Sequence, residues 1–258
     1  MENKLIKPVV QVGTSAGVIL PKAWLNGTAV VKLIEEPPEP SKDIFKILNK
    51  QLPDIKGIYL TGSYARREQD INSDIDIFAI TEKSKGRIKK GKYDIILIPY
   101  KDFTKVIKQI IFPIIPMLRE SKTILNEDLI KPYLNLPLNQ EALNYHLDMI
   151  KSAIKVNKED LKLAKELNEK KLGNGTSYSL ILRLRELYIL DCIKKNKLWG
   201  KKEFISLIKK ITGTKTAYEG YIQIKKGENS KKQLPIVEAE NLIKYIDKEV
   251  EKWEKEKN

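Results

Sequence analysis

Two aspartates in the run SDIDIFAI follow a glycine–serine pair in an order that suits phosphate and metal chemistry. Side chains alternate along a strand, so Asp74 and Asp76 share one face while Ile75 and Ile77 turn toward a core. Carboxylates are hard oxygen ligands, and Mg²⁺ takes one or two of them together with phosphate oxygens and water. The pattern therefore predicts a magnesium site at Asp74 and Asp76.

A third carboxylate, Asp94, opens the apolar run YDIILIPY. If Asp94 lies on a neighbouring antiparallel strand and on the same face, the site gains enough oxygen ligands for two metals roughly 3.5–4 Å apart. Asp70 and Asp102 are rivals for this role. Asp70 belongs to the loop and Asp102 lies past Pro99, so we predict metal ligands and catalytic residues at Asp74, Asp76 and Asp94.

The glycine–serine pair predicts a grip on phosphate. Residues 58–60 form a short apolar strand that ends just before Gly62, where the backbone can approach a ligand closely. Residues 64–68 indicate the first turns of a helix, whose N–H groups and dipole would face a triphosphate together with the Ser63 hydroxyl. Arg66 would add charge-assisted hydrogen bonds there.

This order of motifs, Gly-Ser-x-Ala-Arg, then Ser-Asp-Ile-Asp-Ile, then a third strand aspartate, resembles the nucleotidyltransferase superfamily. That superfamily includes DNA polymerase beta, kanamycin nucleotidyltransferase and the minimal nucleotidyltransferases. The resemblance covers residues 57–98 and implies that the Gly62 and Ser63 loop binds the β- and γ-phosphates, Asp74 and Asp76 bind Mg²⁺, and Asp94 helps to activate the attacking hydroxyl. Arg67 stands where many minimal family members have a glycine.

The first 36 residues predict a separate module. Short extended runs at 9–13, 18–22 and 29–34 are separated by turns, the first of them at 14–17, and such strands cannot bury a core alone. The pattern VGTSAGVILPKAWLNGTAVVKL resembles the AbrB-like swapped-hairpin family, in which two chains interleave into one small barrel. The resemblance implies a homodimer with a twofold axis. Four lysines against three glutamates are a weak footprint for DNA, so dimerisation is favoured over DNA binding.

The remainder of the chain predicts two further modules. A proline-rich linker, 36–40, precedes a domain that we expect at 41–135, with Ser41 as the N-cap of its first helix. Apolar residues then recur at helical spacing in four segments, 143–167, 178–193, 204–211 and 236–253, which predict a helical bundle at 140–258. The expected fold class is α+β, with an N-terminal barrel, a central mixed sheet and a C-terminal bundle. Its architecture is similar to that of kanamycin nucleotidyltransferase, whose helices wall the substrate cleft.

The net charge indicates the kind of partner, and the single cysteine indicates the compartment. A formal net charge of +14 favours anionic partners such as nucleotides or nucleic acid. The densest basic run, 83–92, is predicted to form a soluble hairpin tip beside the site, with contact to phosphate or RNA as the alternative. Lys225 to Gly227 is predicted to be a surface turn, with a position lining the cleft as the alternative. The apolar stretch 104–118 is interrupted by prolines and is too short to span a bilayer. One cysteine, Cys192, suits a reducing cytoplasm.

Together these features predict a Mg²⁺-dependent enzyme that transfers a nucleoside monophosphate from a nucleoside triphosphate to an acceptor hydroxyl and releases pyrophosphate. Two metal ions are expected during turnover, with Mn²⁺ as an alternative. The acceptor is left open among a small molecule, an RNA end and a protein hydroxyl, as in antitoxins that modify their toxins. The alternative is a dimeric DNA-binding regulator or antitoxin whose second domain senses nucleotide or is inactive.

Overall fold

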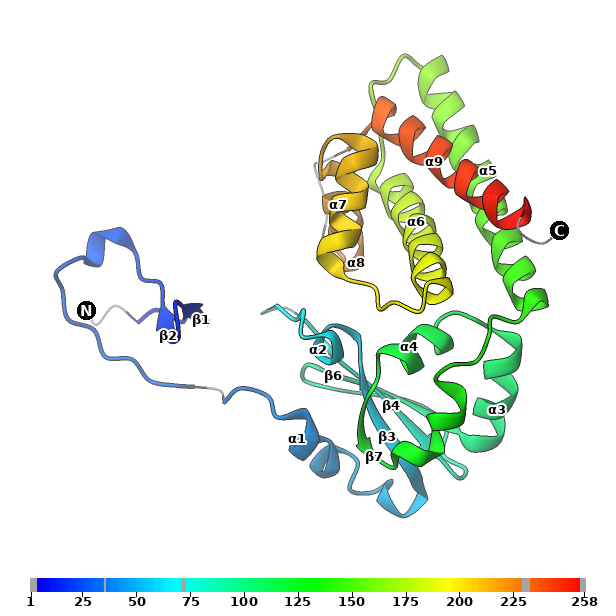
Figure 1. The fold of residues 1–258 in the computed structure, drawn as a ribbon. Coiled ribbons are helices and arrows are strands. Elements are labelled where there is room, and N and C mark those ends of the chain that lie inside the picture. Colours follow the sequence, from blue (N-terminus) through cyan, green and yellow to red (C-terminus); the bar gives the residue numbers. More distant parts are fainter. Residues whose placement is uncertain (1–3, 35, 71–72, 229–232, 256–258) are drawn as a thin grey trace.

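The computed structural model describes residues 4–34, 36–70, 73–228 and 233–255. Figure 1 shows an N-terminal segment that projects from the rest of the chain, a sheet flanked by helices, and a helical region above one end of that sheet. Residues 1–3 and 35 of the predicted N-terminal module lie outside the described residues.

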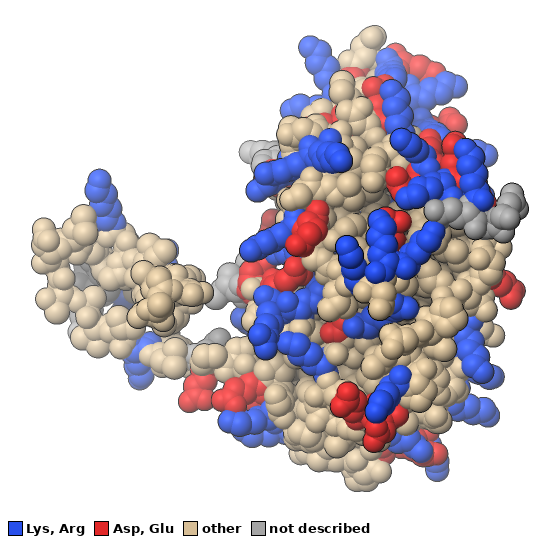
Figure 2. Space-filling model, viewed as in Figure 1, with Lys and Arg blue, Asp and Glu red and all other residues tan. Residues whose placement is uncertain are grey.

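The N-terminal segment contains one small hairpin. Strand β1 (Val9–Val12) pairs antiparallel with β2 (Ser15–Val18) around Gly13, which has a φ of +59°. The turn predicted at 14–17 is therefore wrong, because most of it is strand β2. The strand predicted at 29–34 does not form either, since it has no partner strand among the described residues. None of the described residues 4–34 is buried, and Figure 2 shows mostly uncharged surface on the face in view.

The central sheet is mixed and contains five strands among the described residues. They are β3 (Ile55–Thr61), β4 (Ile75–Thr81), β5 (Gly86–Lys90), β6 (Tyr93–Pro99) and β7 (Lys122–Leu125), in the order β5-β6-β4-β3-β7. Strand β4 pairs antiparallel with β3 but parallel with β6. The expected antiparallel pairing of the Asp76 and Asp94 strands is thus wrong. The basic run forms edge strand β5, which reverses the chain once more before β6.

Helices cover both faces of this sheet. On one face, Ile75, Ile77 and Ile95 pack with helix α1 (Pro40–Ile47). On the other face, the apolar side chains of the sheet pack with α3 (Tyr100–Gln109) and α4 (Ile114–Glu120). The predicted N-cap at Ser41 is corrected by two residues: Glu39 is the cap and proline fills the first helical position, where its missing N–H costs no hydrogen bond.

The C-terminal region consists mainly of α-helices. They are α5 (Gln140–Glu166), α6 (Asn174–Lys194), α7 (Lys201–Thr212), α8 (Thr216–Lys225) and α9 (Ile236–Lys255). Helix α6 is the most buried and packs against α5, α8 and α9, as its apolar circumference predicted. Short strands β8 (Lys171–Leu172) and β9 (Leu234–Pro235) pair beside them. Helix α8 was not expected, so the surface turn predicted at 225–227 begins with a helical residue. None of the helices in the described ranges is long and apolar enough to cross a membrane.

Candidate functional site

The loop after β3 lies against the acidic end of β4. Strand β3 ends at Thr61, and helix α2 (Gly62–Arg66) follows at once as little more than a single turn. Gly62 has a φ of +69°, and a Cβ atom built on it would lie 2.3 Å from Oδ2 of Asp76. Only glycine suits both conditions, so the backbone of the loop is held directly beside that carboxylate.

Asp74, Asp76 and Asp94 lie on neighbouring strands. Asp74 is exposed just before β4, and Asp76 is half-buried within β4. Asp76 is paired in register with Asp94 of β6. Ile75 and Ile77 are buried on the opposite face, which confirms the predicted alternation.

Charges from several elements surround Asp76. The pKa of its carboxyl is raised to about 6, mainly by burial; Asp74, Asp94 and Glu120 contribute in the same direction, and the positive charge of Lys225 opposes them. Lys225 is the last residue of α8, so the helical region brings a cation toward the carboxylates. Sequence reasoning raised this segment only as the less favoured alternative, since its signal was a basic pair that resembled an ordinary surface turn.

Asp94 is engaged by the edge strand. The guanidinium of Arg87 on β5 donates to both of its carboxylate oxygens, and Lys89 Nζ lies 3.8 Å from Oδ2. The hydrogen bonds from Arg87 hold the pKa of Asp94 below its ordinary value. Asp102 pairs instead with Lys85, and Asp70 with Lys201 of α7. Asp94 is the aspartate among these three that lies in register with Asp76.

The donor set accommodates a metal through two residues. Within the described ranges, no three carboxylate, histidine or cysteine side chains converge closely enough to hold a metal ion. Asp94 is turned to Arg87, which accounts for the missing third donor. Asp74 and Asp76 still supply the one or two hard oxygens that Mg²⁺ takes from protein when phosphate provides the others. Mg²⁺ therefore fits Asp74 and Asp76, and Asp94 joins them only by leaving Arg87.

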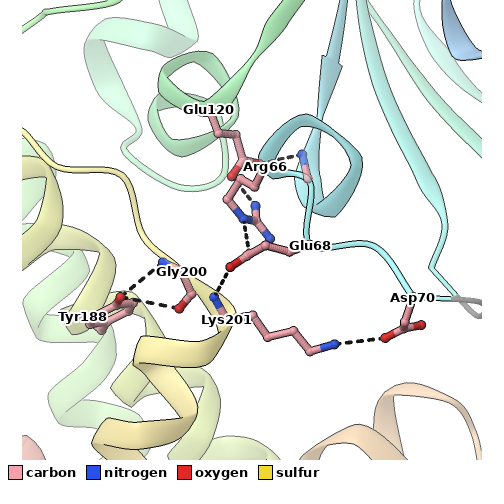
Figure 3. A network of polar contacts seen from close by, with 8 residues as sticks. Arg66, Glu68, Asp70, Glu120, Tyr188, Gly200 and Lys201 are labelled. Atoms are coloured by element: carbon pink, nitrogen blue, oxygen red, sulfur yellow. Dashed lines mark hydrogen bonds and ion pairs between the residues drawn. The ribbon is translucent and has the colours of Figure 1, made fainter. Parts of the chain in front are cut away.

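Arg66 is held by carboxylates on both sides (Figure 3). Its Nη1 donates to Oε2 of Glu120, and its Nε donates to Oε2 of Glu68 at 2.9 Å. The other oxygen of Glu120 accepts the backbone N–H of Gly62 at 2.8 Å. The charge of Arg66 is thus already compensated, and one N–H of the loop that was expected to face phosphate faces Glu120. Sequence reasoning had no signal for Glu120, which is far from Gly62 along the chain.

The sequence of the central sheet region matches a known protein family. Residues 41–134, which contain β3 through β7, match the family model described as nucleotidyltransferase domain. This region is a nucleotidyltransferase domain. The chain is accordingly a nucleotidyltransferase enzyme, and the match specifies no acceptor. Among curated proteins, none has significant sequence similarity to the chain.

Two solved structures are similar to the chain. The spectinomycin adenyltransferase AAD(9) from Enterococcus faecialis, solved with ATP and spectinomycin, is 15% identical with a TM-score of 0.42, and the match covers 81% of this chain and 96% of the other. A nucleotidyltransferase-like protein from Exiguobacterium sibiricum 255-15 is 10% identical with a TM-score of 0.36, over 82% and 73% of the two chains. These values are too low to transfer a substrate or a residue role.

Proposed function

We propose that the enzyme transfers a nucleoside monophosphate from a nucleoside triphosphate to an acceptor hydroxyl with the help of Mg²⁺. The observation that supports this most is the contact between the Gly62 backbone and Asp76, with Asp94 in register on the next strand. The acceptor oxygen bonds to the α-phosphorus, the bond from that phosphorus to the bridging oxygen breaks, and pyrophosphate leaves. The proton of the hydroxyl passes to solvent water.

The loop and helix α8 hold the triphosphate in this proposal. The Ser63 hydroxyl and the backbone N–H groups after Gly62 donate to phosphate oxygens, because the first N–H groups of a helix have no partner within it. Lys225 offsets phosphate charge from the opposite side, in keeping with its effect on Asp76. Arg66 supports the loop through Glu120 and would reach phosphate only by giving up a carboxylate partner.

Asp74 and Asp76 hold the metal. Bound there, Mg²⁺ would offset the negative charge that develops on the phosphate oxygens. Asp94 orients the acceptor by accepting a hydrogen bond from its hydroxyl after Arg87 has moved. We assign orientation rather than proton abstraction to Asp94, because an aspartate carboxylate is a weak base and a poor proton acceptor for a hydroxyl even after Arg87 has moved.

A label-transfer assay tests the proposal. The protein is incubated with each of the four nucleoside triphosphates, labelled on the α-phosphate, with Mg²⁺ and a cell extract that supplies small molecules, RNA and proteins. We expect one labelled product class with wild type and none with Asp74→Ala/Asp76→Ala. If wild type makes no product yet binds promoter DNA in a salt-sensitive manner, the DNA-binding regulator replaces the enzyme.

We also propose that residues 1–36 join two copies of the chain. Large apolar side chains in this segment are exposed, with Ile6 at 83% and Val30 at 96% of their full accessible area. The segment is poor in charge, and the stretch at 29–34 has no partner strand in its own chain, which suits pairing with a second copy. Sedimentation of the full chain should give a dimer and a chain lacking residues 1–36 a monomer. A monomeric full chain would exclude this role.

A further inference from the structure

A chain of four hydrogen bonds connects the Gly62 loop with the helical region (Figure 3). Glu120 accepts the Gly62 N–H and binds Arg66, Arg66 binds Glu68, and the remaining oxygen of Glu68 accepts the backbone N–H of Lys201 at 2.7 Å. Carboxylate and guanidinium therefore alternate from α4, through α2, to the first residue of α7. Both oxygens of Glu68 and both oxygens of Glu120 are used.

The members of this chain are shielded from water. The side chains of Glu120, Arg66 and Glu68 are 7%, 12% and 21% exposed. Ion pairs with so little exposure are less screened by salt than surface pairs, and removal of one partner leaves a charge without compensation. The set is thus expected to act as a unit rather than as independent contacts.

The helical end of the chain is equally well fixed. Lys201 is the first residue of α7, and the preceding Gly200 donates its N–H to the hydroxyl of Tyr188 on α6 at 3.2 Å. The side chain of Lys201 also pairs with Asp70 at 2.9 Å. Two helices of the C-terminal region therefore meet where Glu68 arrives.

We propose that Glu68 is a positioning residue that couples docking of α7 to the shape of the Gly62 loop, an inference that rests on the proposed function of that loop. Glu68 acts through Arg66 and Glu120, which hold the Gly62 N–H and so keep its backbone against Asp76. When the hydrogen bond from the Lys201 N–H to Glu68 is absent, Arg66 and the Gly62 loop are no longer held in a fixed position relative to α7, and triphosphate binding weakens.

A proline at position 201 removes the N–H that Glu68 accepts, and an alanine at the same position serves as the control for the loss of the lysine side chain. Proline is tolerated at the first position of a helix, where its missing N–H makes no bond within the helix. Gly200 has φ −117° and ψ 146°, the extended conformation that a residue before proline adopts. Lys201→Pro and Lys201→Ala both lose the pair with Asp70, but only Lys201→Pro loses the N–H that Glu68 accepts.

Binding is measured by calorimetry with magnesium tripolyphosphate, a probe that avoids the unknown base preference. We expect Lys201→Ala to bind within about twofold of wild type and Lys201→Pro about tenfold more weakly, as for the loss of a hydrogen bond to a charged group. Glu68→Gln keeps the volume of the side chain but has one acceptor oxygen for two donors, so it should weaken binding similarly. In label transfer, both weakened variants should raise the KM for nucleotide and leave kcat nearly unchanged.

The outcomes separate this inference from the proposed function. If wild type does not bind magnesium tripolyphosphate, the phosphate role of the loop fails. If wild type binds and Lys201→Pro equals Lys201→Ala, the coupling is overturned while the function stands. Should Lys201→Pro fail to fold by circular dichroism, Glu68→Gln decides: wild-type affinity for that variant overturns the inference, and a raised KM with an unchanged melting temperature supports it.

Discussion

The inner half of the site, made by Gly62, Asp76 and Glu120, differs in kind from the outer half, made by Asp94 and Arg87. The inner half is partly buried and tied by hydrogen bonds to α4, α2 and α7. The outer half is an ion pair at the edge of the sheet, in which the Arg87 side chain is 58% exposed. Rearrangement of the inner half would leave buried polar groups without partners, whereas exposed pairs separate at a cost of about 1 kcal/mol or less. In the proposed function, the inner half would thus be a preformed phosphate side and the outer half an acceptor side that can change partners.

Removal of Asp76 gives the largest expected effect, because it takes away the carboxylate that lies against the Gly62 backbone. Asp76→Ala should lower nucleotide transfer by about 10²–10³-fold, as for the loss of one preorganised electrostatic group. The measurement is initial rate in the label-transfer assay. The matched control, Asp102→Ala, removes an aspartate that pairs only with Lys85 among the contacts described here and should keep most of the activity. Equal losses in both variants would contradict the assignment.

A methyl group at position 62 tests the contact within the inner half. Gly62→Ala must accept a left-handed backbone and a Cβ that would otherwise lie 2.3 Å from Oδ2 of Asp76. We expect a loss of about 1–3 kcal/mol in the free energy of unfolding and weaker nucleotide binding. Chemical denaturation and calorimetry measure these. Gly175→Ala, where a Cβ meets nothing within 4 Å, is the control, and an equally mild result at both positions would argue against a close contact.

The raised pKa of Asp76 predicts how metal binding depends on pH. A metal ion binds the deprotonated carboxylate. The affinity for Mn²⁺ should therefore reach its full value well above pH 6 and fall by up to about tenfold per pH unit below it. For stability the sign is opposite. The metal-free folded chain takes up this proton near pH 6, before the unfolded chain does, so Asp76 adds stability as pH falls from about 6 toward 4.

Electron paramagnetic resonance of free Mn²⁺ follows the binding, and thermal unfolding without metal follows the stability. Asp76→Asn should bind Mn²⁺ more weakly and show no break near pH 6 in either measurement. A wild-type break near pH 4 would mean that Asp76 is not surrounded by negative charge and low dielectric in solution.

Arg87→Ala probes the outer half, where a smaller effect is expected. The pKa of Asp94 should rise toward its ordinary value, because the hydrogen bonds from Arg87 are the main cause that lowers it. Carbon-13 NMR titration of the carboxyl measures that shift. Since the Arg87 side chain is largely exposed, the transfer rate should change by less than about fivefold. A loss as large as that of Asp76→Ala would show that the outer half is as rigid as the inner one.

The smallest effect is expected at the end of α2. Arg67 has a φ of +58°, in the left-handed region that glycine adopts freely, and it occupies the position where the minimal family members often carry glycine. Arg67→Gly should unfold at a free energy up to about 1 kcal/mol higher than Arg67→Ala, with transfer activity unchanged in both. Thermal unfolding of the two variants measures this. A more stable Arg67→Ala would mean that the backbone is not left-handed here.

Much of the inner half could be predicted from local sequence. Period-two alternation placed Asp74 and Asp76 opposite Ile75 and Ile77, and a glycine before the helix indicated close approach. Those signals lie within one or two elements. The contacts of Glu120 could not be predicted, because they join segments distant in sequence and depend on how α4 packs. The position of Lys225 near the carboxylates was only the less favoured alternative, because it depends on how α8 packs.

The strand arrangement of the outer half was predicted wrongly for another reason. Strand β5 has the sequence GRIKK, in which Ile88 is the one apolar residue, so it read as a basic loop and its reversal of the chain was missed. Without β5, the next strand appeared antiparallel to β4. The N-terminal strand at 29–34 failed because strand propensity expresses itself only beside a partner, and the single chain offers none.

Strand β5 ends the sheet, so its outer backbone donors and acceptors form a template on which another molecule's strand can add. Arg87 and Lys89, which compensate Asp94, also place positive charge along this rim. Two such rims repel each other, so copies of the protein are kept from joining through their sheets. Exchange of both residues for valine would therefore turn a soluble rim into a nucleus for aggregation.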